Sequence, residues 1–162
     1  MRLKTTLPLG QASQIVDEAL RLGRENDMHP LTVVVLDGGG RIVAAKSEDG
    51  SGVLRFGIAM GKAWGALGMG ISSRLIRDRL QARPAFQNAV AVASEGRFIP
   101  VPGGVLIEDG DGFTIGAVGI SGDTSEKDEF CAIGGIHAAG LRSEPAVADD
   151  DWRASKLSDA DK

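Results

Sequence analysis

The segment VLIEDGDGFTIGAVGIS, residues 105–121, decides the fold that we expect for this chain. Its two apolar runs flank Asp109-Gly110-Asp111-Gly112, a composition that favours the positive φ angles of a tight turn. The segment therefore predicts a β-hairpin, with one strand from Val105 to Glu108 and the other from Phe113 to Ser121.

An earlier part of the chain repeats this arrangement. Leu31 to Leu36 is a run rich in β-branched residues, three glycines follow Asp37, and Ile42 to Ala45 is the next apolar run. Short turns join antiparallel strands, whereas parallel strands need long crossover connections. Two hairpins therefore predict an antiparallel sheet and exclude a parallel, Rossmann-type sheet.

Helical patterns lie before, between and after the two hairpins. Apolar residues at helical spacing predict an amphipathic helix from Gly10 to Asn26. The order of helix, hairpin, helices, hairpin and helix predicts the α+β class, with helices packed on an antiparallel sheet. The later helices are expected over 51–69 with a cap at Ser51, over 72–80, over 84–93, and from Asp123 or Thr124 to Ala139 with an end at Gly140.

Length and composition limit the class of protein. The 162 residues fit one domain over residues 1–145, followed by an acidic tail over residues 146–162 that is extended unless Trp152 docks on a neighbouring subunit. A net charge of −4 makes nucleic acid an unlikely partner. A single cysteine, Cys131, rules out an internal disulfide and fits a reducing compartment. No apolar run is long enough for a membrane span, so we expect a cytoplasmic protein.

Glycine makes up 23 of the 162 residues and gathers at the ends and in the interior of the expected strands. Such positions allow a close approach of backbone to another group, which suggests a binding cleft. Four further glycines, Gly57, Gly61, Gly65 and Gly68, fall on one face of a helix. They indicate either tight packing or contact with a flat ligand. The two histidines and Cys131 lack metal-ligand spacing, so no metal site is expected.

Three ionisable residues are candidates for chemistry. Asp37 ends a strand beside three glycines, Asp128 lies in the first turns of the last helix, and Lys62 sits on a small, apolar helix face. The alternatives are a turn-forming role for Asp37, a charge at a helix start for Asp128 and a surface position for Lys62. An acid, a base and exposed amides in one cleft would suffice to bind a small carboxylate or to transfer a proton.

The chain resembles the GlcG/HbpS-like family, often described as haem-binding or haem-degrading, which also supplies the C-terminal domain of PduO-type proteins. The resemblance implies a profilin-like antiparallel sheet flanked by helices, assembly from dimers to octamers, and haem as an occupant. It carries site roles over to Asp37, Lys62 and Asp128, and ligand binding to Gly103, Gly104, Ser121 and Gly122. The motifs that carry it lie at Leu36–Val43, Ile58–Ala63, Pro102–Ile107 and Ile115–Gly122, with Asp128-Glu129.

Two functions follow as hypotheses. The first is an oligomeric, cytoplasmic small-molecule-binding protein whose glycine amides and Lys62 receive haem or another anionic ligand. The second is a cofactor-independent catabolic enzyme, a lyase, isomerase or hydrolase of a small oxo- or hydroxy-acid. In that enzyme Asp37 or Asp128 would act as general base and Lys62 as electrostatic stabiliser.

Overall fold

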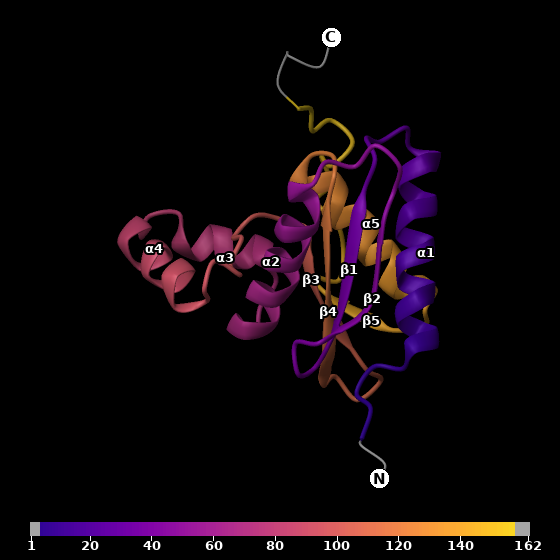
Figure 1. Cartoon of the computed structure of the whole chain (residues 1–162), viewed down its shortest axis with the longest axis horizontal. Helices are drawn as coiled ribbons and strands as arrows, with labels where there is room; N and C mark the ends of the chain where they lie inside the picture. The colour runs from indigo at the N-terminus through magenta and orange to yellow at the C-terminus, as the bar shows by residue number, and fades with distance from the viewer. Residues whose placement is uncertain (1–3, 158–162) are drawn as a thin grey trace.

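The computed structural model describes residues 4–157 and shows an antiparallel sheet with helices on both faces (Figure 1). The α+β fold predicted from the two hairpins is confirmed. The elements are α1 (Leu9–Glu25), β1 (Thr32–Asp37), β2 (Ile42–Ser47), α2 (Leu54–Met69), α3 (Ser73–Leu80), α4 (Pro84–Ala93), β3 (Gly104–Glu108), β4 (Thr114–Ser121), α5 (Ser125–Ala138) and β5 (Arg142–Glu144).

The sheet has the strand order β2-β1-β4-β3-β5, and every neighbouring pair is antiparallel. Both predicted hairpins are present, and Gly40 and Gly112 provide the positive φ angles, +77° and +84°, of their turns. The short edge strand β5 was not predicted. Its three residues carry no alternating apolar pattern, and only the pairing with β3 makes it a strand.

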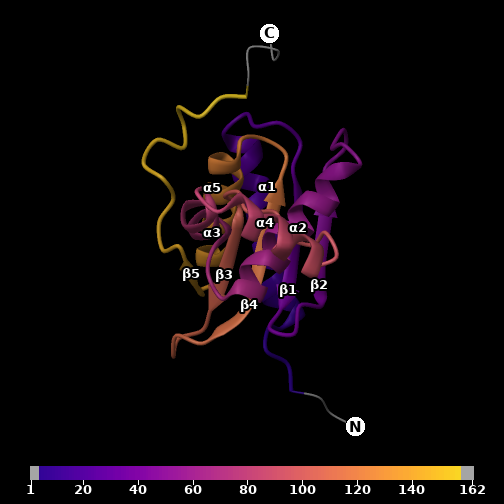
Figure 2. The ribbon, with the colours of Figure 1, turned by 90° about the vertical axis from the view of Figure 1, so that its left-hand side faces the viewer.

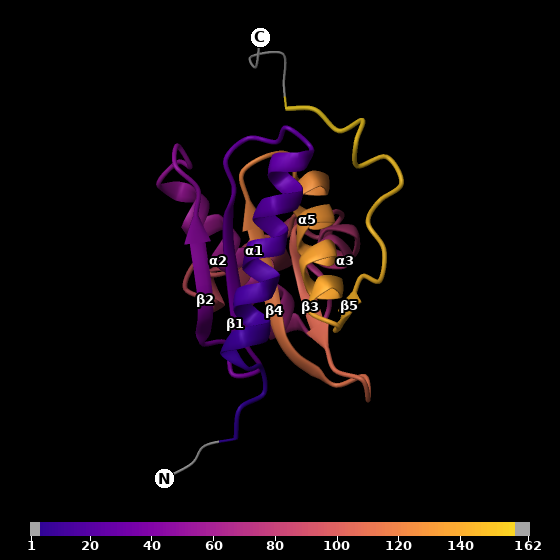
Figure 3. The same cartoon turned by 90° about the vertical axis from the view of Figure 1, so that its right-hand side faces the viewer.

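Helices α1 and α5 cover one face of the sheet (Figure 3). Helix α2 lies on the opposite face, and α3 and α4 extend from it away from the sheet (Figures 1 and 2). The interior position of β1 in the sheet explains why its sequence is continuously apolar. Val33 and Val35 join the core under α1 and α5, whereas Val34 and Leu36 join the core under α2. A strand buried on both faces needs apolar residues at every position.

Helix α2 contacts the sheet almost backbone to backbone. A Cβ atom added to Gly119 of β4 would lie 1.9 Å from the carbonyl oxygen of Ala59, and one added to Gly104 of β3 would lie 2.3 Å from that of Lys62. No side chain fits at either position. The glycines within the strands therefore determine how closely α2 approaches the sheet, and with it the position of Lys62.

The helix starts confirm two predicted caps and correct one. The side chains of Ser72 and Thr124 accept hydrogen bonds at the starts of α3 and α5, as expected. Ser51 does not cap α2, which begins at Leu54. Its hydroxyl is hydrogen-bonded to that of Thr32 at 2.7 Å instead, which places Ser51 beside the start of β1.

The segment after β5 folds back on the same chain. The ring of Trp152 stacks on that of Phe130 of α5, with 3.7 Å between the ring centroids and 11° between the planes. Trp152 thus finds its aromatic contact without the neighbouring subunit that we expected it to need. Within residues 4–157, no helix combines the length and apolar character needed to cross a membrane.

Candidate functional site

A buried ion pair joins α2 to α5 near the C-terminal end of β4. The ammonium group of Lys62 donates to a carboxylate oxygen of Asp128 at 2.8 Å, and both side chains are at most 2% exposed. The surface position considered for Lys62 is therefore excluded. The structure brings together two of the three residues predicted for chemistry, from helices far apart in sequence.

The predicted glycines surround this pair. A Cβ atom on Gly103, whose φ is +109°, would lie 2.9 Å from the Lys62 ammonium nitrogen and 3.1 Å from the Asp128 Cβ. The neighbouring Gly104 is also buried, and its amide donates to the Ser73 hydroxyl at 2.8 Å. Within the described chain these glycines make room for the ion pair, and the Gly104 amide is already engaged.

Opposing effects determine the pKa of the Asp128 carboxyl group. Burial raises the pKa of its carboxyl group to about 6, although the ammonium of Lys62 and the backbone amide of Asp123 stabilise the charged form. The positive charge of Arg55 acts in the same direction as Lys62. Asp128 is thus a carboxyl group with a pKa near neutral pH, and it forms an ion pair with the buried side chain of Lys62.

An open cavity of about 230 Å³ lies beside the end of β4. Arg55, from the first turn of α2, lines this cavity, and its guanidinium group donates to the hydroxyl of Ser121 at 3.3 Å. The remaining wall includes Gly122, one of the residues predicted to bind a ligand. The other residues that line it are His29, Pro30, Gly50, Ser51, Gly52 and Leu157.

The described carboxylates near Arg55 form ion pairs with other cations. Asp128 pairs with Lys62, and Asp123 pairs with Lys127 at 2.9 Å. In the part of the chain that the structure describes, no carboxylate forms an ion pair with Arg55. A half-buried guanidinium at the wall of a polar cavity is a site that an anion would fill.

Arg55 was missed in the reasoning from sequence. It precedes Lys62 by seven residues, which is about two helical turns, so both side chains fall on the same side of α2. That spacing was the available signal. It carried little weight alone, because a basic residue at the start of a helix is ordinary on a protein surface.

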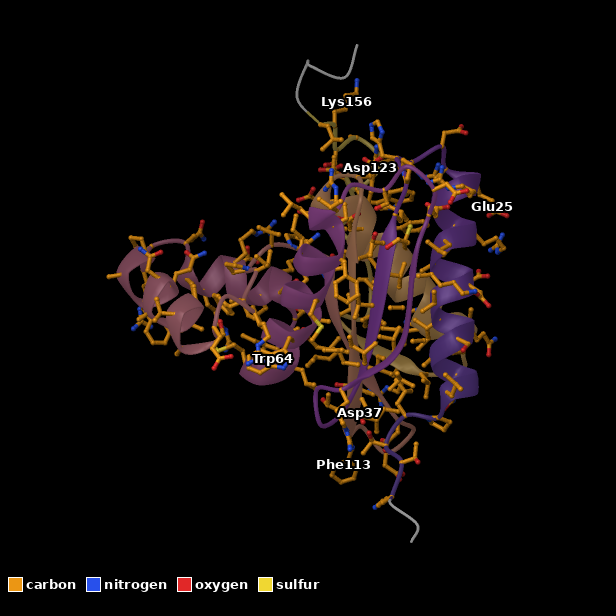
Figure 4. The ribbon with its side chains drawn as sticks, in the orientation of Figure 1. Glu25, Asp37, Trp64, Phe113, Asp123 and Lys156 are labelled. Carbon is orange, nitrogen blue, oxygen red and sulfur yellow. The ribbon has the colours of Figure 1, made fainter. Side chains whose placement is uncertain are left out.

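Asp37 lies away from the other candidates. It pairs with Gly116 in the sheet, whereas Ser121 pairs with Thr32, so Asp37 and Ser121 are separated by roughly 17 Å along the strands. Figure 4 shows Asp37 and Asp123 at opposite ends of the molecule. The backbone amides of Gly39 and Arg41 donate to the Asp37 carboxylate, which gives it a turn-forming contact.

The four helical glycines have separate surroundings. Gly61 and Gly65 face the segment after α4, where an added Cβ atom would meet the side chains of Ile99 at 2.5 Å and Phe98 at 3.2 Å. An added Cβ on Gly57 would meet nothing within 4 Å. Close packing, one of the two alternatives, therefore explains Gly61 and Gly65.

The comparisons with known proteins define the class to which this fold and site belong. The family model described as haem degrading protein HbpS-like matches residues 7–137. The chain therefore belongs to the HbpS-like family. No curated protein matches it.

Solved structures agree with this assignment in their fold. The PduOC haem complex is similar with a TM-score of 0.76 and 22% identity, and the match covers 85% of this chain and 98% of that one. ORFY from Klebsiella pneumoniae is similar with a TM-score of 0.76 and 24% identity, and the match covers 86% of this chain and 94% of that one. HbpS is similar with a TM-score of 0.70 and 21% identity, and the match covers 85% of this chain and 92% of that one.

Haem, the ligand in the first of these complexes, can be tested against the side chains of this chain. His29 lines the cavity of about 230 Å³ beside Arg55, which is smaller than the roughly 300–1,000 Å³ typical of ligand pockets. His137 lines a groove of about 370 Å³ that also contains Asp149 and Asp150, whose charges oppose those of haem propionates. Burial raises the pKa of the Cys131 thiol and keeps it neutral.

Neither of these two cavities therefore offers haem a complete site, because neither combines a histidine, an apolar slot and cations for the propionates. Residues 4–157 contain no group of three or more His, Cys, Asp and Glu side chains placed to hold a metal ion.

Proposed function

We propose that this chain is a homo-oligomeric, cytoplasmic protein that binds a small carboxylate in the cavity beside Arg55. The observation that carries the proposal is Arg55, which lines this cavity and whose guanidinium, among residues 4–157, has one side-chain partner, the hydroxyl of Ser121 at 3.3 Å. Arginine binds carboxylates through two parallel N–H groups, and such charge-assisted bonds are stronger than neutral ones.

The buried pair supports Arg55 in this role. Lys62 forms an ion pair with Asp128, so this buried carboxylate competes less with a ligand for the guanidinium. Ser121 and Gly122, which end β4, supply a hydroxyl and a backbone without a side chain at the cavity wall. The volume of about 230 Å³ favours a ligand much smaller than haem.

Two further parts of the proposal rest on other observations. A cytoplasmic location agrees with the free, buried thiol of Cys131. An oligomer agrees with helix α4, which is apolar and yet has no buried residue. We propose that a second copy of the chain covers this helix.

The experiment is a calorimetric titration of the full chain with acetate, glycolate and pyruvate. Removal of a charge-assisted hydrogen bond costs about 1.5–3 kcal/mol, so Arg55→Gln should weaken binding by roughly 10- to 100-fold. The control is Arg79→Gln, which makes the same change at an exposed arginine of α3 and should leave binding unchanged. Binding that Arg55→Gln leaves intact would refute the proposed site.

A catabolic enzyme is a second candidate because the pKa of Asp128, about 6, suits a general base near neutral pH. The 1% exposure of Asp128 weighs against it, since a general base must reach its substrate. Asp128→Asn separates the two functions. An enzyme would lose turnover of a carboxylate substrate, whereas a binding protein would retain Arg55-dependent binding.

A further inference from the structure

Residues 146–157, which lie beyond the matched family region, form a strap that runs past α5 (Figure 3). The last residue of the strap lines the cavity beside Arg55. Three contacts hold the strap. Arg74 donates to the carbonyl oxygen of Val147 at 2.9 Å, Trp152 stacks on Phe130, and the hydroxyl of Ser155 donates to Glu126 at 2.9 Å. The strap therefore has a defined path up to its last described residue.

That last residue, Leu157, lines the cavity. Its isobutyl side chain and the ring of Pro30 are the apolar groups among the residues that line the cavity, and the others are polar, charged or glycine. A ligand whose carboxylate meets Arg55 would thus have an apolar surface available for the remainder of the molecule.

We infer that the strap makes Leu157 a specificity-determining residue, which selects carboxylates that carry a short aliphatic chain. This inference rests on the proposed function. The family match ends at residue 137, so the strap and Leu157 lie outside the matched region. Selection by Leu157 would distinguish ligands that share the same carboxylate contact with Arg55.

The affinity should rise with the length of the aliphatic chain of the acid, and we call this increase the slope. Burial of one CH₂ group contributes about 0.8 kcal/mol, which corresponds to an affinity gain of about fourfold. The wild-type chain should therefore bind propionate about fourfold, and butyrate more than tenfold, more tightly than acetate.

The test is calorimetric titration of the full chain with acetate, propionate and butyrate. Leu157→Ala should flatten the slope with chain length while acetate binding changes little. Trp152→Ala, which removes the stacking contact of the strap, should flatten the slope in the same way. The matched control is Val147→Ala, an exposed strap residue outside this cavity, which should preserve the slope.

The outcomes separate this inference from the proposed function. Arg55-dependent binding with an unchanged slope in both Leu157→Ala and Trp152→Ala would overturn the inference and leave the proposed function standing. A wild-type chain that binds none of the three acids would overturn both. Far-ultraviolet circular dichroism of each variant verifies that the fold is intact.

Discussion

The carboxyl group of Glu129 is fully buried on α5, beside the ion pair of Asp128. Neither of its oxygens has a hydrogen-bond partner among the described residues, although the guanidinium of Arg74 lies 3.4 Å from one of them. Burial raises the pKa of Glu129 to about 7, and the charges of Arg74 and Arg77 offset only part of this effect. The residue is costly to ionise, so it makes the stability of the protein depend on pH.

The direction of this dependence follows from the raised pKa. The stabilising contribution of protonated Glu129 is fully present below its ordinary pKa of 4.5 and is lost as pH rises through about 7. Glu129→Gln cannot ionise. Relative to wild type, its free energy of unfolding should be higher by about 1–3 kcal/mol at pH 8 and similar at pH 4.5.

Urea unfolding of both proteins between pH 4.5 and 8 measures this difference. Glu95→Gln, at an exposed position after α4, is the control and should stay within about 0.5 kcal/mol of wild type at each pH. Parallel pH profiles for wild type and Glu129→Gln would contradict the raised pKa of Glu129, because they would show that folding leaves its proton affinity unchanged.

At the scale of elements, the contact between α2 and β4 depends on Gly119. A Cβ atom there would lie within 2.8 Å of the Ala59 carbonyl carbon, a backbone atom that moves only with the helix. Gly119→Ala should therefore lower the free energy of unfolding by about 3 kcal/mol, at the upper end of overpacking effects. Gly57→Ala has free space and should raise it by about 0.5–1 kcal/mol.

Urea unfolding of the two variants compares the same substitution in two environments. Equal effects at Gly119 and Gly57 would contradict the close approach of α2 to the sheet. A loss confined to Gly119→Ala would support it, and it would also disturb the position of Lys62, which α2 carries.

Sequence patterns predicted most of the elements because each was marked locally. The turn glycines and the apolar runs marked the hairpins, and helical spacing with capping residues marked the helices. Strand β5 and the course of the strap depend on contacts with β3 and α5, which no local pattern encodes.

The candidate site was predictable only in part for a similar reason. Lys62 and Asp128 stood out because charged residues on small, apolar helix faces are unusual. Whether Asp37 lies near them depends on which end of β1 is close to the site. A sequence motif does not show the direction of a strand in space. Arg55 became visible only once the cavity wall was known.

At the scale of the whole molecule, helix α4 has an exposed apolar surface that contacts within the chain do not cover. It extends from the body of the protein (Figure 1), and none of its residues is fully buried, although Val90 and Ala91 are partly buried against α3. Phe86 and Val92 are 42% and 80% exposed, and the helix contains no charged residue. An uncharged apolar surface can pair with its own copy without repulsion, as a twofold interface requires.

Light scattering coupled to size-exclusion chromatography tests this interface. We expect wild type to exceed the 16.9 kDa of one chain, and Val92→Asp to shift it toward that mass, because a buried charge without a partner opposes association. The control, Val147→Asp, places the same charge at an exposed apolar residue outside α4. A monomeric wild type, or an unchanged mass for Val92→Asp, would contradict the interface.

An amide NMR titration of the wild-type chain with butyrate tests the carboxylate site at Arg55 most directly. The proposed site predicts saturable shifts of the Gly52, Arg55 and Gly122 amides, all from residues that line the cavity, with much smaller changes near Asp37. Butyrate that shifts none of these three amides, or that shifts the Asp37 turn instead, would contradict it.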